Sequence, residues 1–208
     1  MSKESEELLR RLEKVKLEIQ REVNDRLPRK VGAIAVNLFR QNFRDGGFRD
    51  GGLRPWQRTR RQDDPHHPER KYGPLLSRRN HLMNSTQART RPGEVLIENP
   101  VPYAALHNEG GEITTHPTVT PKMRKYAWHM VYSIAGMKKS KKRKKGGMPK
   151  ELPPEAEKWK ALALTQKTRL NVHARIPQRL FIGNSHELKV KVDQAIKESL
   201  DKIKKSII

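Results

Sequence analysis

The sequence contains no cysteine in its 208 residues. The absence of thiols excludes disulfide bonds, thiolate catalysis and zinc sites built on cysteine. The sequence also has no apolar run of roughly 18 residues, and its N-terminus has no apolar segment of the kind found in signal peptides. We therefore expect a soluble, intracellular protein with no membrane contact, whose fold is held by packing alone.

The motifs that serve common enzyme chemistry are missing as well. Ser77, Ser85 and Ser185 lie in no GxSxG or SxxK context, which nucleophilic serines require. The glycine-rich stretches at 45–52 and 109–112 lack the GK[ST] end of a phosphate loop and form no GxGxxG pattern. We predict that the protein is not an enzyme and that it binds no cofactor.

Histidines are present but are not spaced as metal ligands. Two groups combine histidine with acidic residues: one is His66, His67 and Glu69, and the other is His107, Glu109 and His116. Neither group has the HExxH or paired-ligand spacing that places donors around one ion. We predict ordinary loop histidines and no metal site.

The balance of residue types limits the core and favours anionic partners. Hydrophobic residues make up 34% and charged residues 33% of the chain, so we expect one modest compact unit with extensions. Lysine and arginine outnumber aspartate and glutamate by 45 − 23, which gives a net charge of +22. Such a field attracts polyanions or acidic protein surfaces but does not indicate a fold.

The densest positive charge lies in one short run. Seven of the eight residues at 138–145 are basic: Lys138, Lys139, Lys141, Lys142, Arg143, Lys144 and Lys145. These side chains could contact DNA phosphates, because neutralising phosphates releases counterions without any sequence recognition. The run could equally be a solvated loop or an arm that docks on an acidic partner.

Helical periodicity dominates the N-terminal region. Apolar residues recur every three or four positions over residues 6–24, which predicts an amphipathic helix. Pro28 interrupts the pattern but is tolerated early in a helix, and the spacing returns over 31–43, so a second or kinked helix should follow. The four glycines of 45–52 should end that helix.

Three further helices are expected in the second half. Apolar spacing predicts helices over 122–135 and 155–168. Asn184 is followed three residues later by Glu187, the arrangement of a capping box, which predicts the start of a C-terminal helix.

The strand signals are shorter than the helical ones. The apolar run between Glu94 and Glu98 predicts a buried strand, and β-branched residues at 113–120 favour another strand or an extended arm. Residues 53–70 have no sustained period and should form an extended loop anchored by Trp56.

The order of these segments resembles the Mu-like phage virion-morphogenesis family of tail-completion or neck proteins. The similarity spreads over roughly two thirds of the chain. It is carried by VGAIAVNLFRQNFRDGGF at 31–48, Trp56, LLSRRNHLMNS at 75–85, EVLIENPVPYAALHNEGG at 94–111 and IPQRLFIGNSHEL at 176–188. The chain departs from the family at Leu180, where the family usually has proline.

The resemblance implies an α+β fold, with a small antiparallel sheet packed with helices, a long N-terminal helix and a C-terminal helix. We expect a helical extension over 1–28 and a single assembly domain over 29–208. The stretch at about 137–170 is a second departure from the family and looks like a basic loop insertion. Such a protein forms a homo-oligomeric ring in the neck or tail of the virion, after assembly in the host cytoplasm. Its partners would be connector or head-completion proteins and tail-tube or tail-terminator proteins, with DNA in the channel as a further candidate.

The resemblance also assigns structural roles within YAALHNEG (103–110) and IPQRLFIG (176–183). In the first segment, Tyr103, Ala104 and Ala105 would pack against the sheet, while His107 and Asn108 would fix the following loop. In the second segment, Pro177 would orient the chain and Phe181 would anchor the terminal helix. Arg179 would form an ion pair, either with a partner or within the chain. The expected structural residues are Trp56, Tyr103, His107, Asn108, Gly110, Pro177, Arg179, Phe181 and Gly183.

Two other functions remain as alternatives. A phage DNA-binding protein could use the basic run at 138–145 together with the arginines of 54–61, and its binding should be sensitive to salt. A hydrolase or nuclease would need a constellation of carboxylates or histidines, which the sequence does not contain.

Overall fold

The structure is a computed structural model, and it describes residues 3–63, 71–136 and 151–207. The chain divides into two compact units. The main unit comprises residues 1–111 and 176–208, and the second unit comprises Glu112–Arg175. We expected one domain over 29–208 with an insertion at about 137–170. The second unit begins earlier than that insertion, because the segments on both sides of the insertion make their contacts with each other.

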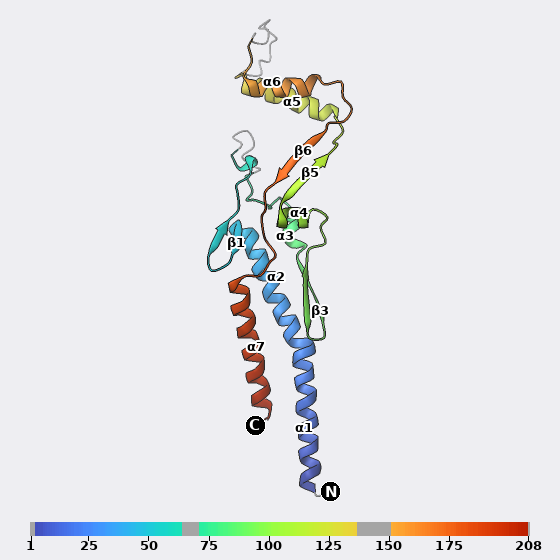
Figure 1. Ribbon diagram of the computed structural model, residues 1–208, viewed down its shortest axis with the longest axis vertical. Coiled ribbons are helices and arrows are strands. Elements are labelled where there is room, and N and C mark those ends of the chain that lie inside the picture. The colour runs from blue at the N-terminus through green and yellow to red at the C-terminus, as the bar shows by residue number, and fades with distance from the viewer. Residues whose placement is uncertain (1–2, 64–70, 137–150, 208) are drawn as a thin grey trace. The chain divides into compact units, whose positions relative to one another are not determined.

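The main unit is built on a long helical rod (Figure 1). Its parts are α1 (Lys3–Arg21), the π-helical turn η1 (Glu22–Arg26) and α2 (Leu27–Asp45). The expected interruption at Pro28 is therefore a widened turn within a continuous helix. Proline cannot donate a backbone hydrogen bond, and its ring crowds the carbonyl four residues earlier, so a π turn before it relieves both problems. The Leu27 N–H accordingly bonds to the carbonyl of Glu22.

Glu22 is the buried acidic residue of this turn. Its carboxylate lies 3.5 Å from Nη1 of Arg26, and the same guanidinium lies 2.5 Å from the carboxylate of Glu18. Both acids raise the pKa of Arg26, Glu18 more strongly than Glu22. The widened turn thus has a charged partner for its buried carboxylate.

The C-terminal helix α7 (His186–Ile207) packs against α2 (Figure 1). Lys30 near the start of α2 pairs with Glu198 in the second half of α7, so the two helices run antiparallel. The predicted cap at Asn184 is wrong. The Oγ atom of Ser185 caps the helix by accepting the N–H of Leu188 at 3.1 Å.

Glu187, the other member of the expected capping box, has a different role. Its carboxylate accepts the backbone N–H of Gly51 at 3.1 Å. Gly51 lies in the turn between two short strands, β1 (Gly47–Arg49) and β2 (Leu53–Pro55), which pair antiparallel. Glu187, the second residue of α7, therefore fixes the β1–β2 turn and does not form a capping box.

A second hairpin covers another side of α2. Strands β3 (Gln87–Arg91) and β4 (Glu94–Glu98) pair antiparallel, with Gln87 opposite Glu98. Gly32 permits this close contact, because a β-carbon at Gly32 would lie 2.9 Å from Cβ of Ala88. The strand over 94–98 is confirmed, but its predicted burial is wrong: Leu96 is exposed.

Short helical turns complete the main unit. These are the 3-10 turn η2 (Arg60–Gln62), α3 (His81–Asn84) and α4 (Ala104–Glu109). Together with the end of α2 they enclose the core, which consists of Phe43, Trp56, Leu82, Met83, Val101, Ala104 and Phe181. The core therefore gathers residues from five separate stretches of the sequence.

The second unit combines a two-stranded ribbon with a helical hairpin. The ribbon pairs β5 (Gly111–Thr115) with β6 (Val172–Ile176), and the hairpin packs α5 (Pro121–Ile134) on α6 (Pro154–Leu164). The rings of Tyr126 and Trp159 meet edge to face across the hairpin at 5.7 Å. The predicted helix over 122–135 is confirmed, whereas the one over 155–168 ends four residues earlier than expected.

The α+β class is confirmed, with long helices at both ends of the chain and small antiparallel sheets. The sheets in the described part of the chain are three separate two-stranded ribbons. Within the described ranges, no helix has the length and apolar character needed to cross a bilayer.

Candidate functional site

The two segments 103–110 and 176–183 lie against each other in the main unit, and we call this contact the motif junction. Asn108 is its centre. The Oδ1 atom of Asn108 accepts the backbone N–H groups of Phe181 at 2.9 Å and Ile182 at 3.0 Å, and its Nδ2 donates to the Ile182 carbonyl at 3.1 Å. The side chain of Asn108 therefore forms the backbone hydrogen bonds of residues 181–182 that a neighbouring strand would otherwise form.

The residues before Phe181 are held by the main chain and by Trp56. The N–H of Arg179 donates to the carbonyl of His107 at 2.8 Å. The indole Nε1 of Trp56 donates to the carbonyl of Leu180 at 2.9 Å. Trp56 thus anchors its own loop, as predicted, and also fixes the second segment. Residues 177–185 form no helix or strand, so these side chains supply the hydrogen bonds that secondary structure would otherwise provide.

Asn42 of α2 completes this arrangement. It is 1% exposed, and its Nδ2 donates to the carbonyl of Phe181 at 3.2 Å. Its Oδ1 accepts the N–H of Arg49 at 3.3 Å, so both ends of the buried amide are satisfied. The sequence contains a signal for this residue: Asn42 lies seven positions after Ala35, on the buried face of the predicted helix. A polar residue in that register indicates a specific hydrogen bond.

The side chain of Phe181 is 1% exposed and fills the centre of the core. Its ring lies 4.8 Å from that of Phe43, which in turn meets Trp56 edge to face at 5.7 Å. Offset and edge-on contacts of this kind add to the free energy gained by burying the rings. Phe181 therefore anchors the chain immediately before α7, in agreement with the role that the resemblance implied.

Gly110 allows the two segments to approach closely. It has φ of 77°, and a β-carbon there would lie 2.8 Å from the backbone nitrogen of Gln178. Any side chain at this position would meet both a conformational cost and a steric clash with main chain. Only glycine fits the junction at position 110.

Arg179 and His107 are the titratable groups of the junction. Arg179 is 7% exposed, and its Nε and Nη2 donate to the carbonyl of Gln57 at 3.3 and 3.1 Å. Among the described residues the side chain of Arg179 therefore has a neutral carbonyl as its fixed partner and no carboxylate, and an ion pair with a partner protein stays a prediction. Burial, and less strongly the charge of Arg61, lowers the pKa of Arg179. Burial, and then Arg179, lowers the pKa of His107.

Several expected roles differ from the contacts in the structure. Tyr103 is largely exposed and lies edge-on to the ring of His107 at 5.8 Å, and Ala105 is exposed, so neither packs against a sheet. Ala104 is buried, but in the core around Phe181. Asn108 bonds to the second segment and not to the loop that follows it. The first segment is a short helix, which points its residues in directions that a strand would not.

The remaining predicted residues lie at the edges of the junction. Pro177 directly follows β6, where a residue without an N–H cannot continue the strand pairing. Gly183 lies against Leu180, whose Cδ atoms would be 3.3 Å from an added β-carbon. The basic run at 138–145 and the group His66, His67 and Glu69 fall outside the described residues. In the described ranges, no three histidine or acidic side chains gather as metal ligands.

Comparisons of the chain with protein families, with curated proteins and with solved structures find no match. The resemblance described above therefore rests on the sequence segments themselves.

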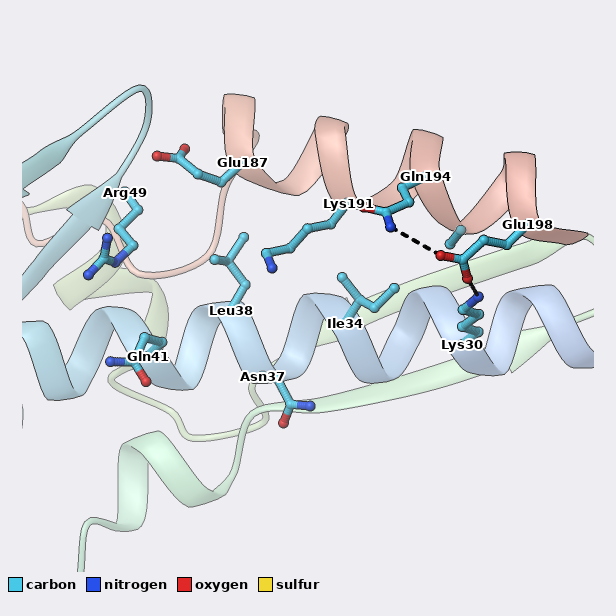
Figure 2. Close-up of a pocket in the computed structure, with 11 residues that line it drawn as sticks. Lys30, Ile34, Asn37, Leu38, Gln41, Arg49, Glu187, Lys191, Gln194 and Glu198 are labelled. Atoms are coloured by element: carbon cyan, nitrogen blue, oxygen red, sulfur yellow. Dashed lines mark hydrogen bonds and ion pairs between the residues drawn. The ribbon is translucent and has the colours of Figure 1, made fainter.

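A groove lies between α2 and α7 (Figure 2). Its volume is about 600 Å³, and Ile34 and Leu38 of α2 project into it. Lys30 pairs with Glu198, which also accepts the side-chain N–H of Gln194 at 3.1 Å. Charges of both signs line the groove, and it offers no concentrated charge to a ligand.

Proposed function

We propose that this protein is a structural component of a tailed-phage virion, a neck or tail-completion subunit that assembles as a homo-oligomeric ring at the head–tail junction. The ordered segments that resemble the Mu-like morphogenesis family motivate the proposal. Their contacts support it, because the junction residues satisfy backbone groups and fill a core. A network used in this way holds a fold together, as a scaffolding protein requires.

The observation that carries the proposal is an apolar stripe on α1 that its own unit leaves exposed. The stripe consists of Leu8, Leu12, Val15 and Ile19, and we call it the α1 stripe. Leu8 is 59% and Leu12 57% exposed. The N-terminal end of α1 extends past the end of α7 (Figure 1), so α7 cannot cover it. Apolar stripes on helices form to be buried, and a second copy of the same helix can bury this one.

Charge favours such self-association through α1 over association through the rest of the chain. Residues 1–26 contain seven basic and seven acidic side chains, so the full net charge of +22 belongs to residues 27–208. Copies of the chain therefore repel each other least along α1. Adjacent subunits of a ring can meet there, while the positive remainder faces acidic neighbours or DNA.

Sedimentation of the full chain tests this assembly. Wild-type protein should sediment as a defined multiple of the 24.1 kDa subunit. The double variant Leu8→Glu, Leu12→Glu places charges in the stripe and should shift the equilibrium to monomer. Leu17→Glu is the matched control, because Leu17 is 54% exposed but lies on the opposite side of the helix. Wild-type protein that stays monomeric throughout the concentration series would contradict the ring.

DNA binding remains the alternative function. It was expected to use the run at 138–145 and the arginines of 54–61, and the contacts of these arginines argue against their part in it. Of the arginines at 54–61, Arg54 pairs with Asp50 at 2.9 Å and Arg58 with Asp63 at 2.8 Å. Arg61 donates to main-chain carbonyls. Duplex binding would therefore depend on the run at 138–145, and a variant with those seven residues neutralised should lose it if this alternative holds.

A further inference from the structure

A cavity of about 370 Å³ opens beside the motif junction in the main unit. Leu75, Leu76 and Leu82 form its apolar wall. Arg61, His107 and Arg179 supply its nitrogen atoms, and we call this space the arginine cavity. It has the composition of a binding site, with apolar walls and a few polar groups that can orient a ligand.

The arginine cavity holds positive charge that the described residues do not neutralise. Arg179 is buried, and within the described part of the chain its side chain has the carbonyl of Gln57 as its hydrogen-bond partner. The guanidinium of Arg61 is close enough for its charge to lower the pKa of Arg179. Among the described ion pairs, none includes either arginine. Arg61 is partly buried, and its guanidinium lies 5.9 Å from the ring centroid of Tyr72. Buried charges in proteins are normally paired, so the buried Arg179 beside a second guanidinium favours an anion at this place.

Two buried polar atoms at the cavity also lack partners. The Nη2 atom of Arg61 donates to the carbonyls of Gly73 and Leu76, at 2.8 and 2.5 Å, which fixes the guanidinium in place. Its Nε atom is buried and forms no hydrogen bond, and neither does the buried Nδ1 of His107. Both atoms are shielded from solvent, so a ligand would bind through the rest of the Arg61 guanidinium. The two hydrogen bonds of Nη2 hold the guanidinium of Arg61 in place at the cavity, so its charge is preorganised for an acceptor that comes from outside.

We propose that the arginine cavity binds the carboxylate of an acidic side chain presented by a partner protein. A glutamate can place its methylene groups against the leucine wall and its two oxygens between Arg61 and Arg179, whose planar donors suit a carboxylate. A nucleic-acid backbone fits less well, since it needs a continuous basic track and this cavity is apolar on one side. The assignment does not rest on the proposed ring, because it follows from contacts within one chain.

Leucine-methyl NMR of the full chain tests the proposal directly. The probe is N-acetylglutamate N-methylamide, titrated at constant ionic strength adjusted with sodium chloride, because a chain of net charge +22 attracts anions non-specifically. The expected result is a saturable shift of the methyl signals of Leu75, Leu76 and Leu82. The uncharged analogue N-acetylglutamine N-methylamide should produce no comparable shift.

Two arginine variants separate this site from general charge attraction. Arg61→Gln should weaken binding by about tenfold or more, the loss expected for a charge-assisted hydrogen bond. Arg58→Gln makes the same change of charge at an exposed position nearby and should leave the affinity within about twofold of wild type. If Arg61→Gln does not fold, Arg61→Lys keeps the charge, removes the planar set of guanidinium donors and should still weaken binding.

Four outcomes would overturn the proposal. One is equal binding of the glutamate and glutamine analogues, and another is an equal effect of the variants at positions 58 and 61. A third is saturable binding of inorganic phosphate without binding of the glutamate analogue, which would make the site a phosphate site. The last is a large gain in affinity on replacing both Asp64 and Glu69 by their amides, because the chain's own carboxylates would then be the occupants.

Discussion

The side-chain oxygen of Asn108 lies 2.9 Å from the backbone nitrogen of Phe181, which it bonds although 73 residues separate the two in the sequence. The same carboxamide also bonds both backbone groups of Ile182. Asn108 therefore fixes the position at which the chain returns to the core before α7. The relationship joins the two segments on which the resemblance rests most heavily.

Replacing Asn108 by alanine should destabilise the protein by about 2–3 kcal/mol, because three hydrogen bonds are lost and the partly buried backbone groups of residues 181–182 lose their partner. Urea unfolding followed by circular dichroism measures the change. Asn37→Ala, at an exposed position of α2, should stay within about 0.5 kcal/mol of wild type. An equal effect of both substitutions would show that the junction does not depend on Asn108.

Gly110→Ala should destabilise the protein by about 2 kcal/mol more than Gly51→Ala. Both glycines have positive φ, of 77° and 68°, so both substitutions carry a conformational cost. A β-carbon at Gly110 would also clash with Gln178, whereas a β-carbon at Gly51 meets nothing within 4 Å. The difference between the two free energies of unfolding isolates the clash, and no difference would mean that the segments are not in close contact.

Phe181→Ala should cost about 3–5 kcal/mol, the usual range for removing a fully buried aromatic ring. The loss comprises the buried area of the ring and its contacts with Phe43 and Trp56. Tyr103→Ala removes a ring that is largely exposed, and it should cost about 1 kcal/mol or less. Thermal unfolding of the two variants gives the comparison, and a smaller loss at Phe181 than at Tyr103 would contradict the core described here.

His107 should make stability depend on pH in one direction. Burial, and then Arg179, lowers its pKa from the ordinary 6.5 in the folded protein. The unfolded chain therefore binds a proton more readily, and the free energy of unfolding should fall as the pH drops through about 6.5 toward the folded-state pKa. That contribution is complete above the unfolded-state pKa.

Urea unfolding of His107→Gln over this pH range measures the contribution. The variant should show a flatter pH dependence than wild type, while the exposed His81→Gln should retain the wild-type slope. Parallel curves for wild type and His107→Gln would show that His107 is not buried as described.

The helices could be predicted from the sequence because their apolar spacing is local. The regions 6–24, 31–43 and 122–135 are all helical. Strand β3 at 87–91 was not predicted, because its sequence QARTR has little alternation of apolar and polar residues. The strand forms through its pairing with β4 and its contact with α2. The observed cap of α7, Ser185, lies one residue after the predicted cap, Asn184. Both residue types cap helices well, and the contact of Glu187 with Gly51 favours Ser185.

The site was predictable in composition but not in geometry. Trp56, Asn108, Gly110 and Phe181 do meet in one junction, as segments that hold a fold together should. The partners of these residues could not be read from the sequence, because each hydrogen bond joins segments that are far apart along the chain. Arg61 shows the limit most clearly: nothing in its sequence neighbourhood distinguishes it from Arg58, yet Arg61 lines the arginine cavity and Arg58 does not.

If the proposed function holds, this chain is part of a phage particle, and a reconstruction of that purified particle is the most direct test. The expected result is density for a ring of this chain at the head–tail junction, with α1 of each subunit contacting its neighbour through the α1 stripe. A well-resolved head–tail junction built entirely from other proteins would contradict it.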